Sequence, residues 1–506
     1  MTRFADDSCM DSMEDLTALL RSRHPLLAVE TDEESRFVRL LGRVADDLNL
    51  PVWIWSATSG LSKQGLASQY GTQDPTIALD FTTALVGPGV FIFADLYPFL
   101  DNPTVVRALK EATTNAKPGQ TYIVTGPDFS IPDELREQAR QWRLKPPSDA
   151  EIADLVDATL RNFVRRGLIV DLVPMDRSRM VSALRGLSLS EAERLLQKTL
   201  LDESTIDTTD IPKLRMAKAA LLANDGILEL VEQKVGTLDQ VGGLQGLKRW
   251  LSLRERAVAQ GLAEQLGLGT PRGILMTGIP GCGKSFVAKT LATTWGRPLV
   301  LLDPSRLYSK YIGETETRLT TALASIETMS PVVLWIDEIE KGFASSGEGD
   351  GGVSRRILGT FLRWMQDHEA DVFIVATAND VTSLPPEFLR RGRFDEIFFV
   401  DLPELSARRA ILELHMTRRN LDTAEFDIDM LAEATTGFSG AEIESSIVGA
   451  LYRSLDDETT VTVDHILDEV SATVPLSQSR PEDIARLRAW AQNRAVPAAG
   501  TPKAAV

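Results

Sequence analysis

The sequence predicts an α/β protein with two parallel sheets, each followed by a helical region. Three observations support this fold class. Short apolar runs bounded by Gly, Pro or Asp recur along both halves of the chain, and they have the length of buried strands. Helix-like stretches separate these runs, and strands that alternate with helices are typical of a parallel sheet covered on both faces. The pattern then turns helical after the last run of each half.

In the first half, strands are predicted for HPLLAV (24–29), VWIWS (52–56), GVFIFADL (89–96) and TYIVTG (121–126). A helix is predicted for SRFVRLLGRVADDL (35–48), and further helices from Pro146 to about residue 235.

In the second half, strands are predicted for RGILMTG (272–278), LVLLD (299–303), VVLWID (332–337), VFIVATA (372–378) and EIFFVD (396–401). Helices are predicted for 284–295 and from Ser406 to about Val470. SSGEGDGG (345–352) predicts a flexible loop, and AVPAAGTPKAAV (495–506) predicts a frayed tail.

The composition excludes several classes of protein. With 54 Lys and Arg against 72 Asp and Glu, the net charge is −18, which disfavours loose binding to nucleic acid or anionic lipid. The only cysteines, Cys9 and Cys282, exclude a disulfide framework and a Cys-rich zinc site. No apolar run approaches the ~18 residues of a membrane helix, and the acidic N-terminal residues show no secretory signal. We therefore expect an intracellular protein of about three domains.

The segment GIPGCGKS (278–285) carries the strongest chemical signal. It fits the phosphate-loop pattern G-x-x-x-x-G-K-[ST] and lies between a predicted strand and a predicted helix, as that pattern requires. Lys284 would contact the β- and γ-phosphates of ATP, and Ser285 would bind Mg²⁺. The alternative is a glycine-rich turn with a chance lysine. The predicted nucleotide-binding residues of this segment are Gly278, Ile279, Pro280, Gly281, Cys282, Gly283, Lys284, Ser285 and Phe286.

Two acids, Asp337 and Glu338, end the predicted strand of VVLWIDEIE (332–340). Asp337 would hold Mg²⁺ through water, and Glu338 would orient or deprotonate the water that attacks the γ-phosphate. Many strands end in acids that are only solvated. Here the acids follow a phosphate loop by about fifty residues, and this spacing favours ATP hydrolysis.

Residues 237–475 resemble an ATPase module of the AAA clade. The segments that carry the resemblance are DQVGGL (239–244), TANDVTSLPPEFLRRGRFD (377–395) and GFSGAE (437–442). The resemblance implies that Asn379 is the sensor-1 residue, which polarises the attacking water or the γ-phosphate. It also implies that Arg390 and Arg393 are arginine fingers, which act on the nucleotide of a neighbouring subunit. The active unit would then be a homo-oligomeric ring, expected to be a hexamer.

The same resemblance assigns residues around the base and ribose. They are Asp239, Gly242, His415, Gly440 and Ala441, the last two forming a small-residue lid turn. Each single assignment has a plain structural alternative: a half-buried helix histidine, a turn asparagine or a solvated basic loop. Cys282 is either a redox-sensitive thiol, with a pKa lowered by the helix N-terminus, or a small residue that fits.

SKYIGETE (309–316) resembles the first pore loop of the AAA clade, with Tyr311, Ile312 and Gly313 as the aromatic–aliphatic–glycine triplet. A ring would present these aromatics to its axis, and loop 345–352 would form a second pore loop. The alternative is that Tyr311 packs against its own subunit. No H-E-x-x-H motif occurs, which excludes a fused metalloprotease.

The first half echoes the second when the two are offset by 247 residues. Every phosphate-loop glycine is replaced, Phe37 stands at the position of Lys284, and the acids at 32–34 would repel phosphate. The strand at 89–96 offers Asp95 without a following acid, and GLSLSEAE (186–193) echoes the lid turn. We therefore predict a degenerate nucleotide-binding-type domain; the alternative is convergent α/β patterning.

These observations predict a P-loop NTPase sheet with a C-terminal helical lid, preceded by a degenerate α/β domain with its own helical region. The predicted parts are a degenerate domain plus lid (1–200), a helical linker (201–236), a large ATPase subdomain (237–403), a helical lid (404–475) and a C-terminal helix with a flexible tail (476–506).

This pairing resembles a family of uncharacterised AAA proteins, known as a hypothetical chloroplast reading frame, of algal plastids, cyanobacteria and other bacteria; RRGRFDEIFFVDLPE (390–404) is especially similar. We expect ATP and Mg²⁺ as cofactors and a location in the cytoplasm, or in the plastid stroma if the source is an alga. The expected function is ATP-driven remodelling of an unidentified protein partner. The alternative is an ATP-dependent regulatory switch or scaffold that threads nothing. The acidic balance disfavours a nucleic-acid motor.

Overall fold

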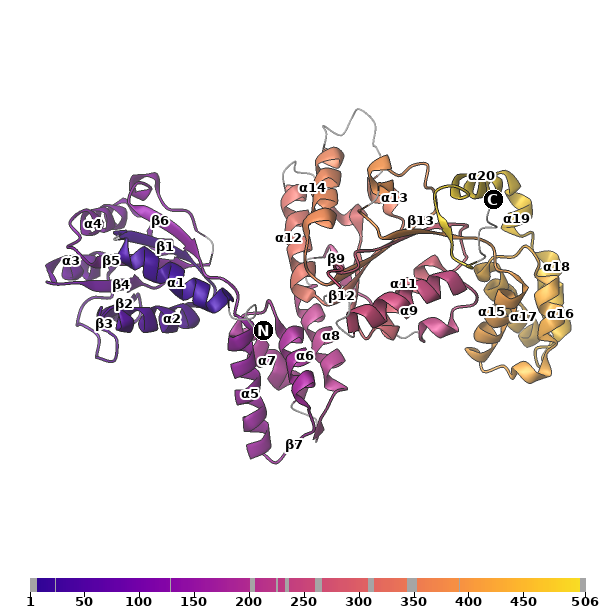
Figure 1. Ribbon diagram of the computed structural model, residues 1–506, viewed down its shortest axis with the longest axis horizontal. Helices are drawn as coiled ribbons and strands as arrows, with labels where there is room; N and C mark the ends of the chain where they lie inside the picture. The colour runs from indigo at the N-terminus through magenta and orange to yellow at the C-terminus, as the bar shows by residue number, and fades with distance from the viewer. Residues whose placement is uncertain are drawn as a thin grey trace. The chain divides into compact units, whose positions relative to one another are not determined.

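The computed structural model (Figure 1) describes residues 7–22, 24–127, 129–200, 205–223, 226–232, 236–259, 266–307, 314–343, 353–390 and 392–500. The chain forms two compact units, residues 1–208 and 209–506. Each unit contains a predominantly parallel sheet and a helical region. Among the described residues, no helix is long and apolar enough to cross a membrane.

The sheet of the first unit has the order β3-β2-β4-β5-β1-β6. Its strands are β1 (Leu26–Glu30), β2 (Val52–Ser56), β3 (Gly60–Lys63), β4 (Gly89–Phe93), β5 (Gln120–Gly126) and β6 (Ala139–Arg143). All pairs are parallel except β2–β3. Apolar residues of β1 alternate between the faces: Leu27 and Val29 pack with α1 (Asp7–Arg21) and α2 (Glu34–Asp47). Leu26 and Ala28 pack with α3 (Pro75–Ala84) and α4 (Pro103–Thr114).

The sheet of the second unit has the order β15-β14-β10-β13-β12-β11-β9. Its strands are β9 (Leu228–Leu230), β10 (Gly273–Gly278), β11 (Leu299–Leu302), β12 (Val332–Ile336), β13 (Val372–Ala378), β14 (Glu396–Val400) and β15 (Val496–Pro497). Only β9 is antiparallel to its neighbour. Figure 1 shows α9 (Gln245–Ala259) and α11 (Lys284–Thr294) on one face, and α12 (Glu314–Met329) and α14 (Val353–Asp367) on the other. The apolar cores on the two faces match this arrangement.

The two sheets share one topology. If the parallel strands of each sheet are numbered one to five along the chain, both sheets have the spatial order 5-1-4-3-2. These strands are β1, β2, β4, β5 and β6 in the first unit and β10 to β14 in the second. The pairing registers also correspond, because Val29 lies opposite Thr125 and Met276 opposite Thr377. The predicted α/β fold class, with a degenerate domain of similar type ahead of a P-loop sheet, is therefore confirmed.

A helical region follows each sheet. It comprises α5 (Asp149–Arg165), α6 (Pro174–Leu184) and α7 (Leu189–Leu200) in the first unit, and α15 (Leu405–Thr417), α16 (Ile428–Ala434), α17 (Gly440–Asp456) and α18 (Val463–Ala472) in the second. The echo between the two lid turns is seen in the geometry. Ser188 and Ser439 both cap a helix with a glutamate three residues on, and the glycines two residues before them both have a φ of 85°.

Two predictions about local structure are wrong in part. The region 146–235 is not all helical. In addition to helices such as α8 (Asp210–Leu222), it contains the strands β7 (Ile169–Val170), β8 (Thr205–Ile206) and β9, and β9 joins the second sheet. The predicted frayed tail contains β15, which pairs with β14, preceded by α20 (Pro481–Ala491). Sheet pairing stabilises these two- and three-residue strands, and sequences this short show no strand periodicity of their own.

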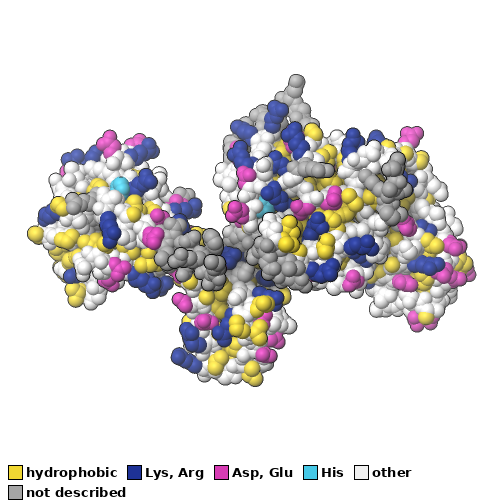
Figure 2. Space-filling view, viewed as in Figure 1, with side chains coloured by type: hydrophobic (Ala, Val, Ile, Leu, Met, Phe, Trp, Pro, Cys, Tyr) yellow, Lys and Arg dark blue, Asp and Glu magenta, His cyan; other side chains and the backbone are white. Residues whose placement is uncertain are grey.

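The surface carries charges of both signs. On the face shown in Figure 2, Lys and Arg side chains are interspersed with Asp and Glu over both units. No continuous basic stripe is visible on this face.

Candidate functional site

The phosphate loop connects β10 to α11 in the second unit. Gly278 and Gly281 have φ values of 137° and 76°, which side chains rarely tolerate. A Cβ atom at Gly278 would lie 2.1 Å from the carbonyl oxygen of Val400, so only glycine fits this close approach to β14. The loop thus turns sharply into the N-terminus of α11, an arrangement whose N–H groups attract anions.

Lys284 lies buried at the start of α11, with 7% of its surface exposed. Its Nζ donates to the carbonyl oxygens of Gly278 and Ile279 at 2.9 and 3.0 Å. Burial lowers the pKa of Lys284 to about 8, although the acids Glu340, Asp337 and Glu338 act in the opposite direction. A phosphate bound beside this ammonium would favour its charged form and raise the pKa again.

A cavity of about 380 Å³ opens above this loop, which is within the size range of small-ligand sites. Its lining combines the phosphate loop with residues from the strand ends of β12 and β13 and from the lid helices α15 and α17. The predicted residues in the lining are Gly242, Pro280, Gly281, Cys282, Gly283, Lys284, Ser285, Phe286, Asp337, Glu338, Asn379, His415, Gly440 and Ala441.

Three of the residues predicted to bind the nucleotide do not line this cavity. Gly278 and Ile279 lie beneath the loop, where Ile279 is fully buried and both carbonyl groups accept from Lys284. Asp239 is exposed and lines a neighbouring cavity instead. These residues therefore contribute to the shape and surroundings of the site rather than to its wall.

Oxygen atoms suited to magnesium meet at the end of β12. The Ser285 hydroxyl donates to Asp337 Oδ1 at 3.0 Å, so the two predicted ligands already lie together. Mg²⁺ in phosphate-transfer sites takes few protein oxygens beside water and substrate phosphates. The hydroxyl of Ser285 and the carboxylate of Asp337 fit that pattern.

Glu338 follows Asp337 in a left-handed backbone conformation, with a φ of 48°. Its Oε1 accepts from the Asn379 side chain at 2.8 Å, and its Oε2 pairs with Lys341. The backbone N–H of Asn379 in turn donates to Glu340 at 2.9 Å. Glu338 and Asn379, the two residues predicted to act on water, are therefore hydrogen-bonded to each other, and both line the cavity.

The other end of the cavity is formed by the lid. The Ala441 N–H donates to the Gly281 carbonyl at 3.0 Å, which joins the lid turn to the phosphate loop. Burial lowers the pKa of His415, so the ring is neutral near pH 7, and its Nδ1 lies 3.3 Å from Glu444. The guanidinium of Arg418 lies over the Phe286 ring, 4.9 Å from its centre. This end offers apolar surface and a neutral imidazole, which suit a base and a ribose.

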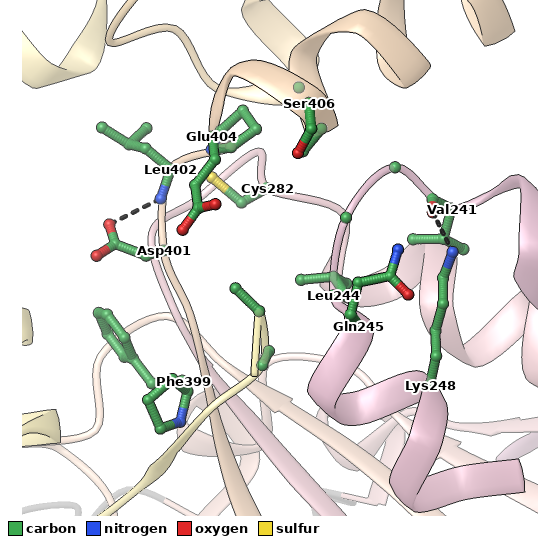
Figure 3. Close-up of a pocket in the computed structure, with 18 of the residues that line it drawn as sticks. Val241, Leu244, Gln245, Lys248, Cys282, Phe399, Asp401, Leu402, Glu404 and Ser406 are labelled. Carbon is green, nitrogen blue, oxygen red and sulfur yellow. Dashed lines mark hydrogen bonds between the residues drawn. The ribbon is translucent and has the colours of Figure 1, made fainter. Parts of the chain in front are cut away.

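Cys282 lies between this cavity and a second one of about 1040 Å³, shown in Figure 3. In this view the second cavity is bordered by Leu244, Phe399 and Glu404. Burial raises the pKa of the Cys282 thiol to about 12, so it is protonated near neutral pH. The raised pKa favours the alternative that Cys282 is a small residue that fits, because desolvation of the thiolate outweighs the nearby positive charge.

The two predicted arginine fingers lie away from the nucleotide cavity of their own chain. Arg390 is exposed, whereas the guanidinium of Arg393 is hydrogen-bonded to the carbonyl oxygen of Leu362. The pore-loop residues Tyr311, Ile312 and Gly313 lie outside the described residues, and so does loop 345–352.

Several residues of the site were not predicted. Thr377, Ile411, Leu414, Arg418 and Glu444 all line the cavity. Arg418 and Glu444 follow His415 and Gly440 at helical spacings of three and four residues, and this spacing could have indicated that they share a face with the predicted residues.

The first unit has a different structure at the corresponding loop. Glu33, with a φ of −106°, occupies the N-cap position of α2 without a side-chain cap hydrogen bond, and residues 31–39 contain no glycine. Phe37, at the position of Lys284, is fully buried in the core. The acids were expected to face and repel any phosphate, yet Glu33 accepts from the buried Arg36 at 3.0 Å and from the Leu189 N–H of its own lid at 2.7 Å.

Arg36 connects this loop to the helical region of the first unit. It is 3% exposed and makes two parallel hydrogen bonds of 3.0 Å to Glu151 near the start of α5. It also donates to the Lys145 carbonyl at 2.7 Å. Ion pairs from Arg36 to Glu33 and Glu151 therefore connect the loop to the helical region of the first unit. The second unit has a phosphate loop and a cavity at the corresponding place.

The comparison of Asp95 with the acids of the second unit needs a correction. In the first unit, Phe93 of β4 lies opposite Val124 of β5, so the next residue, Ala94, has the register of Thr125. In the second unit, Ile336 of β12 lies opposite Ala376 of β13, so Asp337 has the register of Thr377. Asp95 therefore corresponds to Glu338, and both have an unusual positive φ, of 52° and 48°. The acid that the first unit lacks is the preceding one, because Ala94 stands where the second unit has Asp337.

A phosphate loop between the first strand and its helix, acids at the end of a neighbouring strand and a helical lid define a P-loop ATPase. Residues 274–402 match the family described as ATPase family associated with various cellular activities (AAA). Residues 12–143 and 150–225 match the N-terminal and second domains of SpoVK-like AAA ATPases.

Among known proteins, the chain is similar to the uncharacterized AAA domain-containing protein ycf46 of Trieres chinensis, with 35% identity over 95% of this chain and 96% of that protein. It is 33% identical to ycf46 of Guillardia theta over 95% of each chain. It is also 30% identical to the proteasome-activating nucleotidase of Thermococcus kodakarensis, over 51% of this chain and 66% of that protein. The chain belongs to the AAA ATPase family and, within it, to the ycf46 proteins. The predicted resemblance and the predicted ATPase activity are confirmed.

Proposed function

We propose that the second unit hydrolyses ATP with Mg²⁺ in a ring of identical subunits, and that this activity remodels a protein partner. The observation that carries the proposal is the meeting of Lys284, Ser285, Asp337, Glu338 and Asn379 around one cavity. Phosphoryl transfer to water uses these residue types to bind the phosphates, to hold Mg²⁺ and to orient the attacking water.

Each of these residues has a proposed role in the reaction. Lys284 pairs with the phosphates, and Ser285 and Asp337 hold Mg²⁺, which neutralises charge on the phosphate oxygens when bound. Glu338 accepts a proton from the attacking water, and Asn379 holds the Glu338 carboxylate through the 2.8 Å contact. His415, Gly440 and Ala441 contact the base and ribose, together with Gly242.

The proposed ring rests on the arginine fingers. Arg390 is exposed and does not line the cavity of its own chain, so it is available to a neighbouring subunit. A finger stabilises the charge that develops on the γ-phosphate. We propose a hexamer, with Arg390 and Arg393 at each subunit boundary.

The proposed coupling to a protein partner rests on relatives and on the sequence of the pore loop. The name of the proteasome-activating nucleotidase connects the activity of that relative to a protein assembly. Tyr311, Ile312 and Gly313 would grip an extended polypeptide at the ring axis. The first unit, whose nucleotide loop is replaced, would recruit the partner. The predicted domain boundaries and the location in the cell remain predictions.

Replacing Tyr311 with alanine distinguishes threading from the alternative, an ATP-dependent switch. Threading predicts that Tyr311→Ala keeps basal ATP hydrolysis within about twofold but loses the cellular function, because the grip is removed while the nucleotide cavity is untouched. Measurement requires the ATPase rate of the purified protein and complementation of a deletion strain. Tyr311→Phe is the matched control, and it should retain both. Complementation by Tyr311→Ala would contradict threading and favour the switch.

A further inference from the structure

Thr377 bridges the two acids at the end of β12. Thr377 is the penultimate residue of β13, and its side chain is buried, with 1% of its surface exposed. Its hydroxyl donates to Asp337 Oδ1 at 2.6 Å. The same hydroxyl oxygen accepts from the Glu338 backbone N–H at 3.0 Å. One side chain on a neighbouring strand therefore holds both the carboxylate of Asp337 and the backbone of Glu338.

The hydrogen bond from Glu338 to Thr377 forms at a residue with an unfavourable backbone conformation. Glu338 has a φ of 48°, which is unfavourable for any residue with a side chain. The hydrogen bond from its N–H to Thr377 stabilises that conformation, and the conformation directs the Glu338 carboxylate to Asn379 at 2.8 Å. Asp337 Oδ1 takes the hydroxyls of Thr377 and Ser285 together, which fixes that carboxylate as well.

The first unit has the same threonine without its acceptor. Thr125 has the pairing register of Thr377, and Asp95 repeats the positive φ of Glu338. Ala94 replaces Asp337, and the Thr125 hydroxyl is buried without a hydrogen-bond partner among the described residues. Burying an unpaired hydroxyl is unfavourable, so the hydroxyl of Thr125 does not itself stabilise the first unit. The hydroxyl is useful where the acid is present.

We propose that Thr377 is a positioning residue for ATP hydrolysis, which fixes Asp337 and Glu338 relative to each other. This inference rests on the roles proposed above for those two acids. Thr377 does not itself react; it sets the geometry of the oxygens that hold the metal and receive the proton. Residues that orient such groups typically change activity or metal affinity by about 10- to 100-fold when they are removed.

Replacing Thr377 with valine keeps the shape of the side chain and removes its hydroxyl. We expect kcat to fall by about 10- to 100-fold, with the KM for ATP changed by less than about threefold because the phosphate loop is untouched. Hydrogen exchange of the peptide that contains Glu338, measured by mass spectrometry on nucleotide-free protein, should accelerate because the N–H loses its acceptor. Thr377→Ser should restore both properties. Thr125→Val, which removes the unpaired hydroxyl of the first unit, should leave both unchanged.

Two results would overturn the inference. The first is wild-type kcat and wild-type exchange in Thr377→Val. The second is a loss of activity that Thr377→Ser fails to restore, or that Thr125→Val reproduces, since either would show a general effect of strand packing. Glu338→Gln is measured in parallel. Normal turnover in that variant contradicts the proposed function itself, whereas an inactive Glu338→Gln beside an unaffected Thr377→Val contradicts only the inference about Thr377.

Discussion

Replacing Glu338 with glutamine should stop ATP turnover while ATP binding is preserved. Glutamine keeps the size of the side chain and an Oε1 atom that can accept from Asn379, but it cannot take a proton from water. General-base catalysis typically contributes about 10²- to 10⁴-fold, so we expect kcat to fall at least about 100-fold. A steady-state ATPase assay and equilibrium binding of a fluorescent ATP analogue check the two halves of this prediction.

The first unit supplies a matched control for this variant. Asp95 has the strand position and positive φ of Glu338, but Ala94 precedes it and residues 31–39 contain no glycine. Asp95→Asn should therefore leave turnover unchanged. Normal hydrolysis by Glu338→Gln would show that another group receives the proton and that the proposed base is misassigned.

Removing the exposed Arg390 should also abolish turnover, although the nucleotide cavity of the same chain stays intact. Fingers of this kind contribute about 10³- to 10⁵-fold in related phosphoryl-transfer enzymes, so Arg390→Ala should lower kcat by at least about 100-fold. ATP binding should persist, because Arg390 does not line the cavity. Arg107→Ala, which removes an exposed arginine of the first unit, is the control for loss of surface charge.

Mixing two inactive variants tests whether the finger acts between subunits. An Arg390→Ala chain has an intact nucleotide cavity, and a Glu338→Gln chain has an intact finger. In rings assembled from both, some of these intact cavities lie beside an intact Arg390. ATPase activity should therefore reappear on mixing, with a dependence on the mixing ratio. If the mixed rings remain as inactive as each parent, Arg390 does not act in trans.

The phosphate loop and the paired acids could be predicted because their chemistry is local. A glycine pattern between a strand and a helix defines the backbone of the loop, and consecutive acids at a strand end define the metal side of the site. The core strands were predictable for a similar reason, since buried parallel strands are continuous apolar runs. The short strands β9 and β15 were missed because their neighbours, rather than their own sequences, determine their conformation.

Residues that act through contacts between distant segments were not predictable in this way. Thr377 is one polar residue in an apolar strand, and only the packing of β13 beside β12 brings its hydroxyl to Asp337. The network of Glu33, Arg36 and Glu151 in the first unit depends on a contact between α2 and α5. The counterpart of Asp95 was misassigned because strand register, which the sequence does not show directly, decides whether it matches Asp337 or Glu338.

The central claim is that the two units share one architecture but only the second holds ATP. Counting nucleotides tests it most directly: Glu338→Gln protein is saturated with ATP and Mg²⁺, and bound ATP per chain is measured by equilibrium dialysis, with and without the additional change Lys284→Ala. The account predicts one ATP per chain for Glu338→Gln, and none for the double variant, because the first unit has Phe37 and a buried Arg36 network in place of a phosphate loop. Two ATP molecules per chain, or one that survives the loss of Lys284, would contradict it.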